Sequence, residues 1–230
     1  MESIAKCFSQ HFLGDQIPAN HGSAGPSPWK KTVSGEGAIA TNGDSLRLSL
    51  TSGSGAGLAE LALGDKLPFL VSEIIRMRAI VKVSSIADAA VQVSFGLASA
   101  INSVATDSLA ANAMFRAIGS NDLVLETDDG VNDNDDVASG LELNADWQDF
   151  LIDFTQVQQN FPPAKSKGSG SNIKFEGTNG QIRRSAGEAT LFDMSNYTGK
   201  LQPFVRAQKA SGTGVVTVDV KLIEIEYKLT

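Results

Sequence analysis

Acidic residues gather in one short window of the chain, residues 126–136, and no Lys or Arg interrupts them. The window contains five Asp, two Asn and one Glu. Calcium binds several hard oxygen ligands, which a short flexible segment can supply. Asp129, Asp133 and Asp135 are therefore the candidate ligands of a calcium ion, in what we expect to be an exposed loop over residues 127–139.

The alternative is a solvated acidic loop whose Asp and Asn side chains cap turns. The spacing departs from the EF-hand pattern, because Gly130 is misplaced and no Glu closes the set. Charge density alone is typical of a solvated loop and favours this second interpretation. Calcium is the only cofactor that the sequence suggests.

The tripeptide Glu126-Thr127-Asp128 matches the start of Glu-x-Asp-x-x-Glu, the motif of laminarinase-type glycoside hydrolases. Such hydrolysis needs a carboxylate on each side of the scissile bond, but Val131 occupies the position of the closing Glu. No Ser-His-Asp set, G-x-S-x-G elbow or P-loop is present. We therefore expect a protein without enzymatic activity.

The two histidines, His11 and His21, lie in an irregular N-terminal stretch without clustered Cys or carboxylates, which argues against a metal site. Three aromatic residues, Trp29, Trp147 and Tyr197, are candidates for a platform on which a sugar ring stacks. Trp147 opens a strand, and this position favours packing in the core.

Composition limits the classes of partner. The net charge of −7 would be −1 without the six acidic residues of the window, and no basic stripe is present. Nucleic acid and anionic membrane surfaces are therefore not expected as partners. Cys7 is the only cysteine, so no internal disulfide can form. The first residues lack a signal-peptide pattern and no apolar run has the length of a membrane span, so we expect assembly in the cytosol.

Short alternating apolar runs separated by Gly, Ser, Asn and Asp indicate an all-β chain. We expect a single two-sheet antiparallel jelly-roll sandwich over residues 36–230, preceded by an N-terminal arm or extended segment over residues 1–35. This segment is either a surface loop that Trp29 docks onto the domain or an arm that reaches a neighbouring subunit. In the last strand the apolar parity changes near Leu222, which predicts a β-bulge there. Strands are expected at 45–51, 57–63, 75–83, 91–97, 113–118, 122–127, 147–154, 203–209 and 216–227, with a hairpin formed by 172–176 and 181–184.

Several segments resemble phage virion structural proteins that contain a concanavalin A-like (LamG-like) jelly roll. The resemblance covers roughly residues 45–228. It rests on VSFGLAS (93–99), AMFRAIGSNDLVLETDDG (113–130), DNDDVASGLELNADWQDFLIDF (133–154), TLFDMSNYTGKLQPFVRAQKASG (190–212) and VVTVDVKLIEIEY (215–227).

This resemblance implies a capsid decoration (cement) protein that binds the outer surface of a phage head and stabilises it. The implied partners are the major capsid protein and further copies of this chain, in a homo-oligomer for which a trimer is the expected state. The implied location is the capsid exterior of a virion assembled in the host cytoplasm. The alternative is a lectin-like carbohydrate-binding module of a head or tail fibre, with a calcium-dependent form of binding among the options.

Overall fold

The computed structural model describes residues 5–12, 29–66, 68–101, 106–154, 173–179, 182–187 and 190–228. Within these ranges the chain forms strands and two short 3-10 turns, η2 (Val71–Glu73) and η3 (Thr106–Ser108). No helix among the described residues is long and apolar enough to cross a membrane. The first strands are β1 (Ala5–His11), β2 (Lys30–Gly35), β3 (Gly37–Asn42), β4 (Ser45–Leu50), β5 (Gly57–Ala62), β6 (Phe69–Leu70), β7 (Ile74–Val83) and β8 (Val91–Ala98).

The second half of the chain supplies the remaining strands, which complete both sheets. They are β9 (Asn112–Ile118), β10 (Asp122–Asp128), β11 (Asp133–Glu142), β12 (Gln148–Asp153), β13 (Lys174–Asn179), β14 (Ile182–Ala186), β15 (Lys200–Lys209) and β16 (Val216–Lys228).

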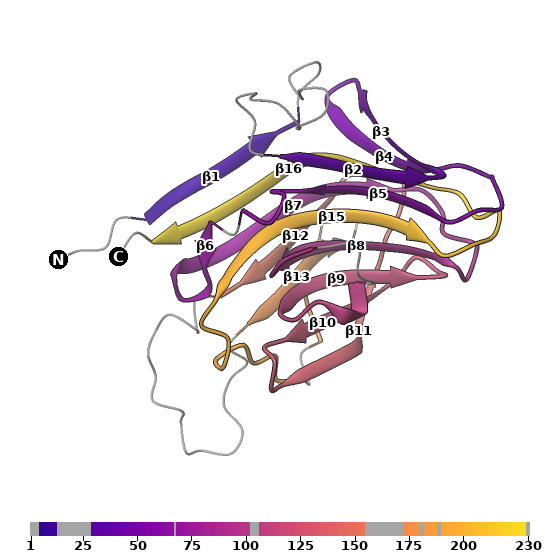
Figure 1. Cartoon of the computed structure of the whole chain (residues 1–230). Helices are drawn as coiled ribbons and strands as arrows, with labels where there is room; N and C mark the ends of the chain where they lie inside the picture. The colour runs from indigo at the N-terminus through magenta and orange to yellow at the C-terminus, as the bar shows by residue number, and fades with distance from the viewer. Residues whose placement is uncertain are drawn as a thin grey trace.

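The strands form two antiparallel sheets that face each other, as Figure 1 shows. Sheet A has the order β14-β13-β12-β7-β16-β4-β3, and β1 pairs with β16 beside this path. Sheet B has the order β11-β10-β9-β8-β15-β5-β2, and β6 pairs with β15. Some runs of strands stay within one sheet, such as β8–β11 in sheet B and β12–β14 in sheet A, and the other connections cross between the sheets. The predicted two-sheet sandwich is confirmed.

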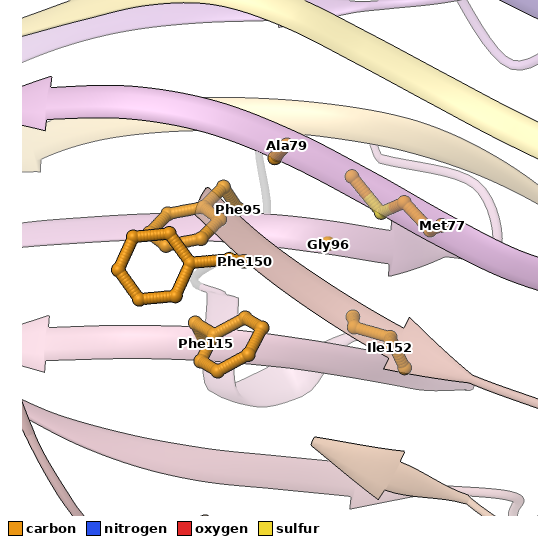
Figure 2. A pocket seen from close by; sticks show the side chains of 7 residues that line it. All are labelled: Met77, Ala79, Phe95, Gly96, Phe115, Phe150 and Ile152. Carbon is orange, nitrogen blue, oxygen red and sulfur yellow. The ribbon is translucent and has the colours of Figure 1, made fainter. Parts of the chain in front are cut away.

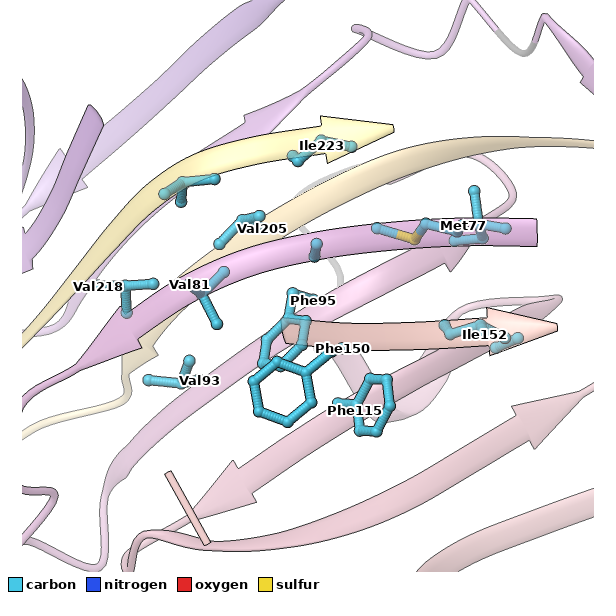
Figure 3. Close-up of a cluster of buried hydrophobic side chains, with 14 of the residues drawn as sticks. Met77, Val81, Val93, Phe95, Phe115, Phe150, Ile152, Val205, Val218 and Ile223 are labelled. Atoms are coloured by element: carbon cyan, nitrogen blue, oxygen red, sulfur yellow. The ribbon is translucent and has the colours of Figure 1, made fainter. Parts of the chain in front are cut away.

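The core lies between the sheets, because alternate side chains of each strand point inward. Sheet A contributes Met77, Val81, Phe150, Ile152, Val218 and Ile223, and sheet B contributes Val93, Phe95, Phe115 and Val205 (Figure 3).

The rings of Phe95, Phe115 and Phe150 lie at the centre of this core, with centroids 5.0–5.3 Å apart. Figure 2 shows these rings beside Met77 and Ile152, around a gap that has no room for a water molecule. The interior of the sandwich is therefore close-packed and contains no ligand cavity at this point.

The predicted bulge is present in β16. The register of β16 against β7 shifts between Val220 and Leu222, so that Val218 and Ile223 both face the core although their sequence parity differs. The bulge also divides the other edge of β16 between two partners. Residues 216–220 pair with β4, and residues 222–228 pair with β1.

The expected boundary between an arm (1–35) and a sandwich (36–230) is wrong for the described residues. Residues 5–11 are strand β1 of sheet A, and residues 30–35 are strand β2 of sheet B. Phe12 and Trp29 are buried in the main core, 1% and 3% exposed. The sequence of this region lacks alternation, but its few aromatic residues supply enough apolar surface to hold it on the sandwich. Residues 13–28 lie outside the described residues.

Candidate functional site

Asp129, the first candidate calcium ligand, anchors a turn. Its buried carboxylate accepts hydrogen bonds from the backbone N–H groups of Val131 (2.9 Å) and Asn132 (2.7 Å). It also accepts from the Asn132 side chain (3.1 Å) and from the backbone and side-chain N–H groups of Asn196 (3.1 and 3.0 Å). Burial raises the pKa of Asp129, but these hydrogen bonds outweigh it and hold the pKa below its ordinary value. The oxygens of Asp129 are thus already used by N–H donors.

The other two candidate ligands, Asp133 and Asp135, are exposed on β11, which is the edge strand of sheet B. The expected loop over residues 127–139 is therefore wrong, because residues 133–139 pair with β10 and leave only a short turn. Within the part of the chain that the structure describes, no group of three or more His, Cys, Asp or Glu side chains is arranged to hold a metal ion. The three Asp residues are not brought together as a ligand set.

Glu126, the first residue of the hydrolase-like tripeptide, is buried on the outer face of sheet B. Its carboxylate accepts from the Arg116 guanidinium (2.9 Å) and from the Asn112 side-chain amide (3.2 Å). Val131, at the position of the closing Glu of that motif, lies in the turn after β10 and is 75% exposed. Glu126 therefore has no second carboxylate at the position where the hydrolase motif places its closing Glu.

A second buried carboxylate, Glu60, faces the same side of sheet B and is paired with the Arg206 guanidinium (2.8 Å from Nε). Burial raises the pKa of Glu60 above its ordinary value, although Arg206 opposes the shift. Four strand spacings separate β5 from β10, or about 19 Å at about 4.8 Å per spacing. Glycoside hydrolysis needs carboxylates within roughly 10 Å, so Glu60 and Glu126 cannot act as a pair.

Part of this outer face, near the ends of β5 and β8, is filled with apolar side chains. A small cluster covers it, and Ile101 and Leu109 of that cluster come from the segment between β8 and β9. The cluster consists of Ala62, Ala98, Ile101, Leu109, Met114 and Phe204. The outer face of sheet B therefore presents no open cleft over these residues.

An open hollow lies on the outer face of sheet A, where β4, β16 and β7 run side by side (Figure 1). Its volume is about 220 Å³. At its floor the Asp219 side chain is 2% exposed and accepts two hydrogen bonds from Arg47, at 2.7 and 2.8 Å. The Lys82 ammonium lies 3.2 Å from the same carboxylate. The lining residues are Arg47, Lys82, Ser84, Ala145, Thr217 and Asp219.

The charge of Asp219 is stabilised by these partners. Burial raises the pKa of Asp219, but hydrogen bonds from Arg47, Lys82 and Asn42 outweigh it and place the pKa below its ordinary value. The same contacts raise the pKa of Arg47. The floor of the hollow is therefore a fixed, ionised network at neutral pH.

Trp147 stands at the side of this hollow. Trp147 is partly exposed, and its ring has the Lys82 ammonium 4.9 Å and the Lys221 ammonium 5.4 Å from the ring centroid. Lys221 also pairs with Asp44 at 2.7 Å. Lys82 lines the hollow and lies over the ring, so the indole and the hollow form one continuous surface. We call this surface the Trp147 site.

The expectation that Trp147 packs in the core is wrong. Gln148, Phe150 and Ile152 take the inward positions of β12, and the alternation then places Trp147 on the outer face. The sequence already contained this information, because Trp147 is separated from the apolar Phe150 by an odd number of positions. The other two candidate rings are elsewhere: Trp29 is buried, and Tyr197 packs against the core and donates to the Lys200 carbonyl (3.2 Å).

Comparison with known proteins defines the fold. No protein-family model matches the chain, and no curated protein matches it. Peanut lectin is similar in structure, with a TM-score of 0.59, 10% identity and coverage of 99% of both chains. The carbohydrate recognition domain of Emp47p has a TM-score of 0.58 and 10% identity over 96% of this chain and 95% of that one. Bacillus licheniformis β-glucanase has a TM-score of 0.54 and 11% identity over 97% and 98%.

These likenesses show the fold alone, since the identities are low. The chain is a concanavalin A-like jelly-roll sandwich, which confirms the fold class expected from the sequence.

Proposed function

We propose that this protein is a lectin-like carbohydrate-binding module and that it binds its saccharide at the Trp147 site. The observation that supports this proposal is a partly exposed indole, with two lysine ammonium groups over its ring, beside an open, polar hollow. A sugar ring has an apolar C–H face and a rim of hydroxyl groups, so an aromatic face next to fixed polar groups matches both parts.

The polar groups of the site are held in place before any ligand arrives. Arg47 is fixed by its two bonds to Asp219, and these two residues lie opposite each other on β4 and β16. The Ser84 hydroxyl accepts the backbone N–H of Thr217 at 2.9 Å, which fixes the far wall of the hollow. A site that is already ordered loses less conformational entropy on binding.

The similar structures support the proposal only at the level of the fold. Peanut lectin and the carbohydrate recognition domain of Emp47p have this fold. The β-glucanase has the same fold, so the fold does not decide between binding and hydrolysis. The wide separation of Glu60 and Glu126 favours binding.

A glycan array tests this proposal. We expect the wild-type protein to bind a set of saccharides and Trp147→Ala to lose that binding, with the thermal unfolding midpoint nearly unchanged. Tyr197→Ala is the matched control, because Tyr197 is a partly exposed aromatic residue in the segment between β14 and β15 and does not line the hollow, so this variant should keep its binding. An array without signal, or equal signal for Trp147→Ala, would contradict the proposal.

Capsid decoration stays a prediction that rests on the sequence resemblance. The major capsid protein and further copies of this chain are the partners that it requires, and co-sedimentation with capsids is its test. Residues 5–12 are not free to bridge to such a partner in this structure, because β1 pairs with β16 of the same chain. Glycan binding and display on a virion are compatible, as in the fibre alternative.

A further inference from the structure

We infer that the saccharide taken by the Trp147 site is anionic and carries a carboxylate or sulfate group beside the stacked ring. This inference rests on the proposed function and names the class of its ligand. It follows from which hydrogen-bonding groups the site still has available, and from how its charges are arranged.

Among the described residues that line the hollow, Asp219 is the only carboxylate, and its oxygens are already saturated. One oxygen of Asp219 accepts from Asn42 (3.1 Å) and Arg47 (2.7 Å), and the other accepts from Arg47 (2.8 Å) and lies 3.2 Å from Lys82. Four donors occupy the roughly four lone-pair positions of a carboxylate. Asp219 therefore has little capacity to accept a hydrogen bond from a sugar hydroxyl.

The charged groups that remain are donors. Lys and Arg side chains carry N–H groups and no acceptor, and the Lys82 ammonium has further N–H groups beyond its contact with Asp219. Lys221 adds a second ammonium on the same indole. A rim of donors selects a ligand that is rich in acceptors, and an anionic oxygen accepts roughly twice as strongly as a neutral one.

The two ammonium groups lie over the same ring, 4.9 and 5.4 Å from its centroid. The exposed Asp44 is the ion-pair partner of Lys221 at 2.7 Å. An exposed ion pair of this kind contributes little stability and is easily exchanged. A ligand anion that took the place of Asp44 would pair with Lys221, whereas a neutral sugar offers no charge for this exchange.

Local charge opposes the charge of the whole chain. Two cations and one anion line the hollow and the Lys221–Asp44 ion pair adjoins it, while the protein carries a net charge of −7. A negative protein repels an anionic ligand at long range, so binding must come from this local cluster. Such binding should weaken as salt screens the lysines.

The test compares three oligosaccharides of equal length by isothermal titration calorimetry: an oligogalacturonate, a sulfated oligosaccharide and a neutral gluco-oligosaccharide. We expect at least one anionic ligand to bind at least about tenfold more tightly than the neutral one, the equivalent of one charge-assisted hydrogen bond. The oligogalacturonate and the sulfated ligand distinguish the two sources of negative charge.

Lys221→Glu should abolish the preference for the anionic ligand. Lys174→Glu is the matched control, because Lys174 is exposed on the same outer face and does not line the hollow. Thermal unfolding of each variant verifies that it is folded. Equal binding of the neutral and anionic ligands, or a Lys221→Glu variant that keeps the preference, would overturn the inference but leave the proposed function standing. Failure of all three ligands and of the glycan array would overturn both.

Discussion

Asp219 and Arg47 are 172 positions apart in the sequence but lie directly opposite each other on β16 and β4, joined by two hydrogen bonds of 2.7 and 2.8 Å. Their ion pair forms the floor of the Trp147 site and fixes the last strand to the first long hairpin of sheet A. The same contact thus contributes to stability and prepares a binding surface.

Asp219→Asn should lower the free energy of unfolding at pH 7 by about 1–3 kcal/mol, because it removes the charge from a network of charged donors. The pKa of Asp219 in the folded state is below its ordinary value. The stabilisation of the fold by the ionised Asp219 side chain is therefore fully present above the unfolded-state pKa of about 3.9 and is lost as the pH falls through the folded-state pKa. Urea unfolding across pH 2–7 measures this. The curves of variant and wild type should converge in acid, and a constant difference would contradict the assignment.

Asp129→Ala should destabilise the protein by about 2–3 kcal/mol, because it leaves the N–H groups of the turn and of Asn196 without their acceptor. Asp133→Ala should have little effect, since Asp133 is exposed at the start of β11. Chemical denaturation compares the two variants. Similar losses would show that the anchoring role of Asp129 is wrong.

Calcium should not raise the thermal unfolding midpoint, and EDTA should not lower it, because the oxygens of Asp129 are occupied by N–H donors. Calcium that bound the folded state would stabilise it by mass action. Differential scanning fluorimetry at increasing calcium concentration is the measurement. Two results together would contradict this prediction and support the calcium site expected from the sequence. The unfolding midpoint of the wild-type protein would rise with calcium, and the midpoint of a variant with Asp133 and Asp135 replaced by Ala would not.

Lys209→Met should lower stability by about 2 kcal/mol. The Lys209 ammonium is surrounded by four backbone carbonyls, those of Thr51 (2.6 Å), Gly53 (2.6 Å), Gly212 (2.9 Å) and Gly214 (3.2 Å). It therefore joins the loop after β4 to the turn between β15 and β16. Lys174→Met is the exposed control, and an equal effect of both substitutions on urea unfolding would contradict this role.

Deletion of residues 1–12 should destabilise the sandwich by at least about 3 kcal/mol. The deletion removes β1 from the edge of β16 and removes the buried Phe12 ring from Trp29, whose centroids are 5.6 Å apart. Hydrogen exchange should show faster exchange of the backbone N–H groups of residues 222–228. Unchanged stability and exchange would favour the free arm that the sequence suggested.

The sequence predicts the inner strands well, because their side chains alternate. Leu46, Leu48 and Leu50 give β4, and the change of parity in β16 correctly predicts the bulge. β2, β3 and β11 were not predicted, since they are edge strands in which only Ser139 and Leu141 are buried. Pairing with a neighbour determines such strands, and the partner is distant in the sequence.

The candidate site was harder to predict than the fold. Asp129 is anchored to Asn196, 67 residues away, so the sequence alone left its carboxylate available for calcium. The Trp147 site needs the register of three strands, which brings Arg47, Lys82 and Asp219 together. The outward parity of Trp147 was readable from Phe150 and Ile152, but nothing local shows that two lysines cover its ring.

The most direct test of the central claim is calorimetric titration of the wild-type protein and of Trp147→Ala with the saccharide that gives the strongest array signal. We expect saturable binding to the wild-type protein, a loss of affinity of at least about tenfold in Trp147→Ala, equivalent to roughly 1.4 kcal/mol, and no loss in Tyr197→Ala. Equal affinity of wild type and Trp147→Ala, both folded, would contradict it.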